Sequence, residues 1–545
     1  MLDRLPDGEA NPPLYSGLAW AWAHVFGDGE AGLRSLSALA GTALVVVAWA
    51  AARTLVAGAV AGTERRAAAI AGVLTALLVA TNPMLVWYSQ EARAYALLTL
   101  LAGLSALLLA SLLRRASSPP ARYSSPRPSS ALLAGWAACG ALMVLTHYFA
   151  VFLLAAEAAV LLWRLPAERG RVIAASFAWI AAGLAVLPLA AEQGDDSRAS
   201  WIGDEPLGER VADVARELAT ANTALISSNS PAPGGVYWVP AVLGLAIGIV
   251  ACVAGRRALR GSGVALVAGA AGASLAVPLL LALTPLDFFK DRNLIAAWPI
   301  AAVALGAALA LRASPRLAAV AGAAVAAAGV LVCVAVARDE ELQRADWRGA
   351  LASLRRDDVP RAIVVQPAYA HAPLRFYDVN TRPLVAGTGV RELVVVGTEA
   401  LPERAPASLG RLRLVERWRR RQIGFVRYRA AAGLERLDDR ALRASPGLLY
   451  QPSAAARRWG ADVAAAGDVW RRAAAAGQLG DALRRDLAAT ARRAPALADV
   501  PEEVADAPEL ARRIRAIAKA AEEYAREGTP EGRDALREAL AALTS

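Results

Sequence analysis

The long apolar stretches of this 545-residue chain fall almost entirely within residues 33–337, and this feature restricts the fold more than any other. A run of about 20 apolar residues is long enough to cross a hydrocarbon core of ~30 Å as a helix. Only helices and closed barrels satisfy every backbone polar group in lipid. These runs are too long and too uniformly apolar for barrel strands. We therefore expect a mainly α-helical, polytopic transmembrane bundle over residues 1–337.

Ten spans are expected, and short polar connections separate them. Their approximate ranges are 33–58, 66–86, 92–113, 131–147, 148–165, 171–191, 236–255, 263–284, 294–312 and 316–337. Arginine gathers in five alternate connections, whereas the others are poorer in arginine or mixed in sign. Positively charged connections mark the cytoplasmic side. This pattern predicts a multi-pass protein of the cell (inner or plasma) membrane, with residues 338–545 on the extracytoplasmic side.

The net charge of +11 is carried almost wholly by arginine, since only Lys290 and Lys519 are lysines. Because the arginines follow the expected connections, the charge indicates topology, and no nucleic-acid partner is expected. Cys139, Cys252 and Cys333 all fall in apolar runs. Buried thiols are by default inert packing residues, so neither a disulfide framework nor a metal site is expected.

Two different regions follow the apolar part. Residues 338–430 contain strand-length apolar runs, for example Leu393-Val394-Val395-Val396, and a helical pattern that begins at Trp347. This mixture predicts a small α/β domain. Residues 431–545 change to an Ala/Arg/Glu-rich composition, with an apolar stripe of helical period that ends before Gly528. They predict a helical accessory region, and nothing in them indicates chemistry.

Polar residues cluster at those span ends that should face the outer side, and polar groups at membrane depth tend to be functional because they are costly. The four clusters are Asn11–Tyr15, Trp87–Tyr95, Thr146–Tyr148 and Asp287–Asn293. Their convergence on one face predicts a site for a polar, anionic ligand.

Each cluster also has a simpler interpretation. Trp87 and Tyr148 could belong to the aromatic belt of the membrane interface. His147 could be a hydrogen-bonded interface histidine, and Arg93 and Arg292 could extend to lipid headgroups.

Glu91 is harder to explain in this way. If a helix starts near Tyr88, then Tyr88, Glu91 and Tyr95 share one face and Arg93 lies nearly opposite. Lys290, as a rare lysine, weakly indicates a contact with phosphate.

These clusters resemble motifs of the GT-C membrane glycosyltransferases. Asn11-Pro12-Pro13-Leu14-Tyr15 is similar to that superfamily's His-Pro-Pro-Leu-Tyr segment, and Tyr88-Ser89-Gln90-Glu91-Ala92-Arg93-Ala94-Tyr95 is close to its Tyr-Ser-Gln-Glu-Ala-Arg-x-Tyr motif. His147-Tyr148, the Phe289–Pro299 segment and Asp346-Trp347-Arg348 also fit. The branch is that of the protein O-mannosyltransferases and the aminoarabinose lipid A transferases. The resemblance covers about residues 11–370.

The resemblance implies an enzyme that takes a sugar from a polyprenyl-phosphate donor and transfers it to an acceptor glycan, lipid or protein at the outer membrane surface, with membrane lipids as neighbours. A carboxylate would act as general base, and cations would stabilise the departing lipid phosphate. Glu91 would position a substrate or a cation. Lys290, Arg292 and Arg93 suit the phosphate. The remaining substrate-binding residues would be Asn11, Tyr15, Tyr88, Tyr95, His147 and Tyr148.

The chain departs from the motif pattern near its start. The family's catalytic aspartate precedes the Pro-Pro-Leu-Tyr segment and follows a first transmembrane helix, and its histidine is Asn11 here. Asp7 is the candidate for the aspartate, although it stands only four residues before Asn11. We therefore expect that the sequence begins late and lacks the first helix.

Two other functions fit many spans with polar ends. One is a lipid or sugar transporter or flippase, although transporters place polar residues at mid-membrane and often in repeated halves. The other is a non-catalytic membrane scaffold that presents residues 338–545. No acidic pair stands at metal-ligand spacing. We therefore expect no tightly bound cofactor, although a divalent metal remains compatible with the reaction.

Overall fold

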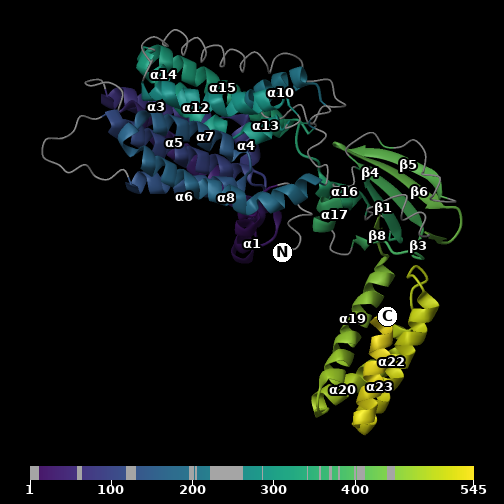
Figure 1. The fold of residues 1–545 in the computed structure, drawn as a ribbon. Helices are drawn as coiled ribbons and strands as arrows, with labels where there is room; N and C mark the ends of the chain where they lie inside the picture. Colours follow the sequence, from purple (N-terminus) through teal and green to yellow (C-terminus); the bar gives the residue numbers. More distant parts are fainter. Residues whose placement is uncertain are drawn as a thin grey trace. The chain divides into compact units, whose positions relative to one another are not determined.

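The computed structural model divides the chain into two compact units, Met1–Gln343 and Arg344–Ser545 (Figure 1). Each unit is described by itself. The described residues are 11–57, 64–117, 130–195, 202, 205–220, 262–284, 287–312, 314–340, 342–354, 358–366, 371–377, 381–397, 401, 412–437 and 448–544.

Unit 1 is a bundle of helices. Its described helices are α1 (Leu14–Phe26), α2 (Glu30–Val56), α3 (Glu64–Ala80), α4 (Pro83–Ser89), α5 (Tyr95–Ser117), α6 (Ser130–Thr146), α7 (Ala150–Arg164), the 3-10 turn η2 (Pro166–Glu168), α8 (Arg169–Asp195), α10 (Leu207–Thr220), α12 (Gly263–Leu281), α13 (Asp291–Leu294), α14 (Ala297–Arg312) and α15 (Pro315–Arg338). Short turns join most neighbours, so consecutive long helices run antiparallel.

Five described helices, α2, α5, α8, α12 and α15, are long and apolar enough to cross a membrane. The pair α3 and α4 passes the same test together, but it is bent by 61°. The chain is therefore a multi-pass membrane protein. Helices α6, α7 and α14 have 17, 15 and 16 residues, fewer than the ~20 of a full span. The expected span 236–255 lies outside the described residues.

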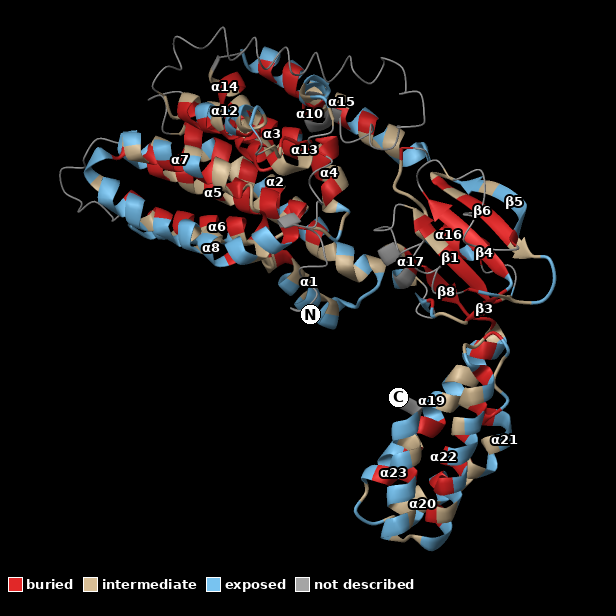
Figure 2. Ribbon diagram, turned by 45° about the vertical axis from the view of Figure 1, so that its right-hand side comes forward, coloured by how far each residue is buried: buried red, intermediate tan, exposed pale blue. Residues whose placement is uncertain are grey.

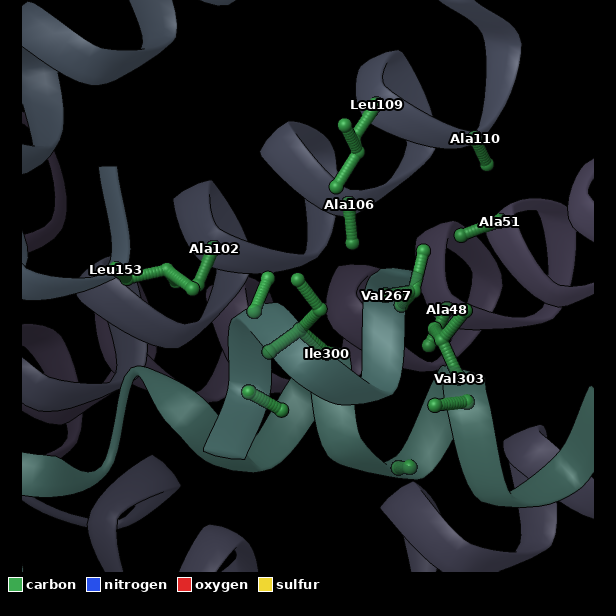
Figure 3. Packing of buried hydrophobic residues seen from close by; sticks show 14 of the residues in the cluster. Ala48, Ala51, Ala102, Ala106, Leu109, Ala110, Leu153, Val267, Ile300 and Val303 are labelled. Carbon is green, nitrogen blue, oxygen red and sulfur yellow. The ribbon is translucent and has the colours of Figure 1, made fainter. Parts of the chain in front are cut away.

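Small side chains let the helices of unit 1 pack closely. Four alanines are fully buried and lie together in the core: Ala48 and Ala51 of α2, and Ala102 and Ala106 of α5 (Figure 3). Alanine and glycine allow close backbone approach where lipid supplies no hydrophobic drive between helices. Helices α8 and α15, by contrast, have only 17% of their apolar windows buried (Figure 2). Their exposed apolar faces suit contact with lipid.

Unit 1 also buries a carboxylate within the bundle. Glu157 of α7 is fully buried and accepts hydrogen bonds from the Ser105 hydroxyl of α5 and, at 2.7 Å, from Trp136 Nε1 of α6. These bonds tie three helices together at membrane depth.

Unit 2 begins with a six-stranded sheet in the order β2-β8-β1-β4-β6-β5, flanked by helices α16 (Trp347–Leu354) and α17 (His371–Tyr377). The strands are β1 (Arg361–Gln366), β2 (Arg382–Pro383), β4 (Glu392–Gly397), β5 (Leu412–Arg420), β6 (Ile423–Ala430) and β8 (Leu449–Gln451), and β3 (Gly389–Val390) pairs separately with β7 (Glu435–Arg436). Strands β1 and β4 are parallel, and β6 joins β4 antiparallel. Strand β8 pairs with β1 and β2. The sheet therefore extends beyond residue 430, the residue at which the change in composition had predicted the end of the α/β domain.

The last part of unit 2 is helical: α19 (Ala454–Ala475), α20 (Asp481–Arg492), α21 (Ala494–Leu497), α22 (Ala507–Glu527) and α23 (Pro530–Thr544). The apolar stripe of α22 is buried through Ile514, Ile517 and Tyr524 in a core shared with Trp470 of α19. Gly528 ends α22 with a φ of 69°, a left-handed conformation that glycine adopts at low cost.

Candidate functional site

Several helix ends meet at one end of the unit 1 bundle. The starts of α2, α5 and α7 lie there, and so do the ends of α4, α6 and α8, because successive helices alternate in direction. The loop before α13 reaches the same place through contacts described below. The chain therefore brings its four polar clusters to neighbouring helix ends.

The second cluster occupies a break between α4 and α5. Asn82 starts α4 by accepting a hydrogen bond from the Leu85 amide at 3.0 Å, with Pro83 in the first turn. The helix ends at Ser89, and α5 begins only at Tyr95. The expectation that one continuous helix presents Tyr88, Glu91 and Tyr95 on a single face was therefore wrong.

Glu91 and Arg93 lie together inside this break. Arg93 Nη1 is 3.9 Å from Glu91 Oε2. The side chain of Arg93 is 32% exposed and that of Glu91 is 15% exposed. The expectation that they lie on opposite faces was wrong, because the chain between α4 and α5 is not helical. Their exposure means that the site reaches the surface of the bundle.

A chain of aromatic rings connects three of the four clusters. Tyr88 and Tyr95 have ring centroids 4.5 Å apart, and Tyr95 lies 5.8 Å from His147. His147 is followed by Phe149 at 5.5 Å, and Phe149 lies 5.2 Å from Phe288. These contacts join α4, α5, the α6–α7 turn and the loop before α13.

The first cluster reaches the site through α2. The Tyr15 hydroxyl lies 3.1 Å from Ser37 Oγ, and Ser37 donates to the Arg93 carbonyl at 3.4 Å. The guanidinium of Arg93 lies 5.0 Å from the centre of the Tyr95 ring. These bonds hold the backbone of the α4–α5 break against the start of α2.

Asn11 and Tyr148 meet at the end of α8. The Tyr148 hydroxyl donates to Gln193 Oε1 at 2.9 Å, and Gln193 Nε2 donates to the Asn11 carbonyl at 3.5 Å. Gln193 lies outside the motifs, and only its burial at a helix end distinguishes it.

Two ion pairs fasten the loop before α13 to the start of α10. Arg210 donates to both carboxylate oxygens of Asp287 at 2.7 and 2.5 Å. Hydrogen bonds from Arg210 lower the pKa of Asp287 against the opposing effect of burial. Lys290 Nζ lies 2.7 Å from Glu205 Oε2. Lys290, which the resemblance assigns to phosphate, thus has a carboxylate partner here, and Glu205 keeps 39% of its side chain exposed.

Asp291 is a buried acid that the sequence interpretation passed over. It is 1% exposed, and neither of its carboxylate oxygens has a hydrogen-bond partner among the residues that the structure describes. Its neighbours in sequence, Phe289 and Leu294, pack with Val214 of α10 in one apolar cluster. The sequence signal was only its place in the fourth cluster, between Lys290 and Arg292.

Of the remaining predicted residues, Arg292 is half-buried and close enough to His147 to act on it electrostatically. Asp7 lies outside the described residues. Within the described ranges, no group of three histidine, cysteine, aspartate or glutamate side chains is placed to hold a metal ion.

Comparisons with known proteins give a limited result. No protein-family model and no curated protein sequence matches the chain. Crystal structures of ArnT from Cupriavidus metallidurans, in the apo state and bound to undecaprenyl phosphate, align with 62% of this chain at 19% identity and a TM-score of 0.38. The aligned part spans 56% of the ArnT chain, a little over half its length.

Proposed function

We propose that this chain is an integral membrane glycosyltransferase that transfers a sugar from a polyprenyl-phosphate donor to an acceptor outside the cytoplasm. The carrying observation is the α4–α5 break, where the Tyr88–Tyr95 motif holds Glu91 and Arg93 together at the surface of the bundle. Catalytic groups on a non-helical segment anchored by two buried helices are positioned and yet accessible. The acceptor and the identity of the sugar are left open by this proposal.

Chemical roles follow from the side chains at the break. Transfer of a sugar needs a base near the acceptor hydroxyl and cations near the departing phosphate. Glu91 lies 3.9 Å from the motif cation Arg93 and would position an acceptor hydroxyl or that cation. Arg93 and Arg292 would stabilise the phosphate. Lys290 would join them only by exchanging Glu205 for a phosphate oxygen, which the exposure of Glu205 permits.

Cysteine labelling can test the membrane orientation on which this proposal depends. With arginine-rich connections in the cytoplasm, Gln90, Lys290 and the whole of unit 2 lie on the extracytoplasmic side. Single cysteines at positions 90 and 290 should react with an impermeant maleimide from outside intact cells. Labelling of the two positions from opposite sides would contradict a shared site.

The activity itself is tested in membranes that contain the full-length protein. We expect radiolabel from polyprenyl-phosphate mannose to pass to an endogenous acceptor. Glu91→Ala and Arg292→Ala should lose most of this transfer at unchanged expression. Label transfer that is the same in both variants and in wild type would overturn the proposal.

A lipid or sugar transporter is the second candidate, and the 61° bend between α3 and α4 favours it, since broken helices are common at transporter binding sites. Sealed vesicles distinguish the two functions. Uptake of the labelled lipid-linked sugar without covalent transfer would support transport. Covalent transfer in detergent, where no compartments exist, would exclude it as the explanation.

A further inference from the structure

The strongest anomaly in unit 1 is the Asp291 carboxylate. A buried charged group normally has ion-pair or hydrogen-bond partners, because desolvation without them is costly. Asp291 is 1% exposed, and both of its oxygens lack a partner among the described residues. Such a group, within one of the four polar clusters, calls for a ligand that brings hydrogen-bond donors.

Neighbouring donors are oriented elsewhere. Lys290 Nζ contacts Glu205, and Asn293 Nδ2 donates to the Phe288 carbonyl at 2.9 Å. The amide of Phe289 donates to Asp287 at 3.2 Å. Among the described residues, these bonds hold the loop before α13, and the Asp291 carboxylate contributes none of them.

His147 supplies a second incomplete group at the same place. It is 3% exposed, and its Nδ1 atom has no hydrogen-bond partner in the described structure. Its ring lies 5.8 Å from Tyr95 and 5.5 Å from Phe149, and Phe149 lies 5.2 Å from Phe288 in the loop that leads to Asp291. The turn that carries His147 therefore packs against the loop that leads to Asp291.

A carboxylate, an imidazole and aromatic rings together match the surface of a sugar. An ionised carboxylate only accepts hydrogen bonds and can take two, as adjacent hydroxyl groups can donate. Aromatic side chains supply apolar area next to such polar groups, a combination found in small-molecule sites.

We infer that Asp291 and His147 bind the hydroxyl groups of the pyranose ring of the donor sugar, with Asp291 accepting from two adjacent hydroxyls. This inference rests on the proposed function and assigns sugar recognition to residues other than those that hold the phosphate.

The test compares lipid ligands that differ only in the sugar. Full-length protein in nanodiscs is titrated with polyprenyl-phosphate mannose and with polyprenyl phosphate alone. Asp291→Asn should weaken binding of the mannose lipid about 10- to 100-fold, the effect of losing hydrogen bonds to a charged acceptor. Its binding of polyprenyl phosphate alone should be unchanged.

Two further variants separate recognition from structure. His147→Gln should weaken binding of the mannose lipid by a smaller factor. Glu157→Gln removes a buried carboxylate elsewhere in unit 1 and should leave the preference for mannose lipid over bare lipid intact. Melting temperatures are measured for all variants, and Asp291→Asn should match or exceed wild type because it removes an uncompensated charge.

Each contrary outcome has a defined meaning. Equal weakening for both mannose lipid and bare lipid would assign Asp291 to the phosphate and overturn the inference. Retention of the full preference for mannose lipid over bare lipid in Asp291→Asn would also overturn it, while the proposed function would stand. Wild-type protein that binds neither lipid would overturn the proposed function and the inference together.

Discussion

The sheet of unit 2 and the helix ends of unit 1 each bury a carboxylate, but they surround it differently. Glu392 of β4 is fully buried, and Arg361 contacts it through Nε at 3.0 Å and Nη2 at 2.8 Å. Arg429 donates to its other oxygen at 3.0 Å, and Arg427 lies 3.8 Å away. Asp291 is 1% exposed, and in the described part of the chain its carboxylate oxygens have no hydrogen-bond partner.

The difference separates a structural acid from one available to a ligand. Around Glu392, three arginines from the neighbouring strands contact one carboxylate, so the network fixes the packing of β1, β4 and β6. Around Asp291, the surrounding loop is held by other groups, and the carboxylate retains its capacity to accept hydrogen bonds. Substitution should therefore damage stability at the first position and ligand binding at the second.

The largest effect is expected for Glu392→Gln. Removing the acid leaves Arg361, itself 1% exposed, as an uncompensated buried charge, which costs about 3–5 kcal/mol. Amide hydrogen exchange of the full-length protein should show protection of β4 and β6 falling by at least about a hundredfold. Glu416→Gln is the control, because Glu416 is an exposed partner of Arg427. Equal, small changes in both variants would contradict a structural role for Glu392.

Acid should weaken the same network in wild-type protein. Burial alone would raise the pKa of Glu392, but hydrogen bonds from Arg429 and Arg361 outweigh it and hold the pKa below the ordinary value of 4.5. The stabilisation is therefore complete above that value and is lost as the pH falls below it. Exchange protection of β4, corrected for intrinsic rates, should decline below about pH 4.5. The decline should be flatter in Glu392→Gln, and an identical decline would assign acid sensitivity to other groups.

At the helix ends of unit 1, Arg93→Ala should change activity and not stability. Loss of one group that stabilises developing charge lowers turnover roughly 10²-fold or more, while the 32% exposure of Arg93 keeps the stability cost small. Arg34→Ala is the matched control, since Arg34 also pairs with a glutamate, Glu30, at the start of α2. Transfer activity and melting temperature are measured together. A drop in melting temperature that accounts for the loss of activity would make Arg93 a structural residue like Arg361.

A smaller effect is expected where α2 supports the α4–α5 break. A Cβ added at Gly41 would lie 2.7 Å from Ser89 Cβ, so Gly41→Val must displace the end of α4. Overpacking of this kind costs about 1–3 kcal/mol, and turnover should fall about tenfold as the motif shifts. Gly269→Val is the control, because an added Cβ there meets nothing within 4 Å. Wild-type activity in Gly41→Val would show that the break tolerates displacement.

Local signals predicted much of this architecture. The apolar runs located the described long helices, and the runs at 362–365, 393–396 and 423–426 lie within β1, β4 and β6. The alternation of helix direction also indicated which polar clusters share an end. These features depend on residues close together in the chain, so the periodicity and composition of the sequence predict them.

Features that depend on distant packing were not predictable in the same way. The helical spacing of Tyr88, Glu91 and Tyr95 assumed an uninterrupted helix, but Asn82 and Pro83 begin a short helix that stops at Ser89. Asp291 looks like its polar neighbours in sequence but is buried, and the flanking residues Phe289 and Leu294 pack against α10, more than 70 residues away. Strand β8 joins the sheet from beyond the apparent domain boundary because its partners are β1 and β2.

The most direct measurement is photo-crosslinking of the full-length protein in nanodiscs with a polyprenyl-phosphate sugar that carries a diazirine on the sugar ring. Sequencing of the crosslinked peptides by mass spectrometry should locate the label in residues 88–95, 147–149 and 287–294. An excess of unlabelled donor should compete it away. Label confined to the middle of the bundle around Glu157, or to the arginine-rich connections at the opposite end, would contradict a sugar-transfer site at these helix ends.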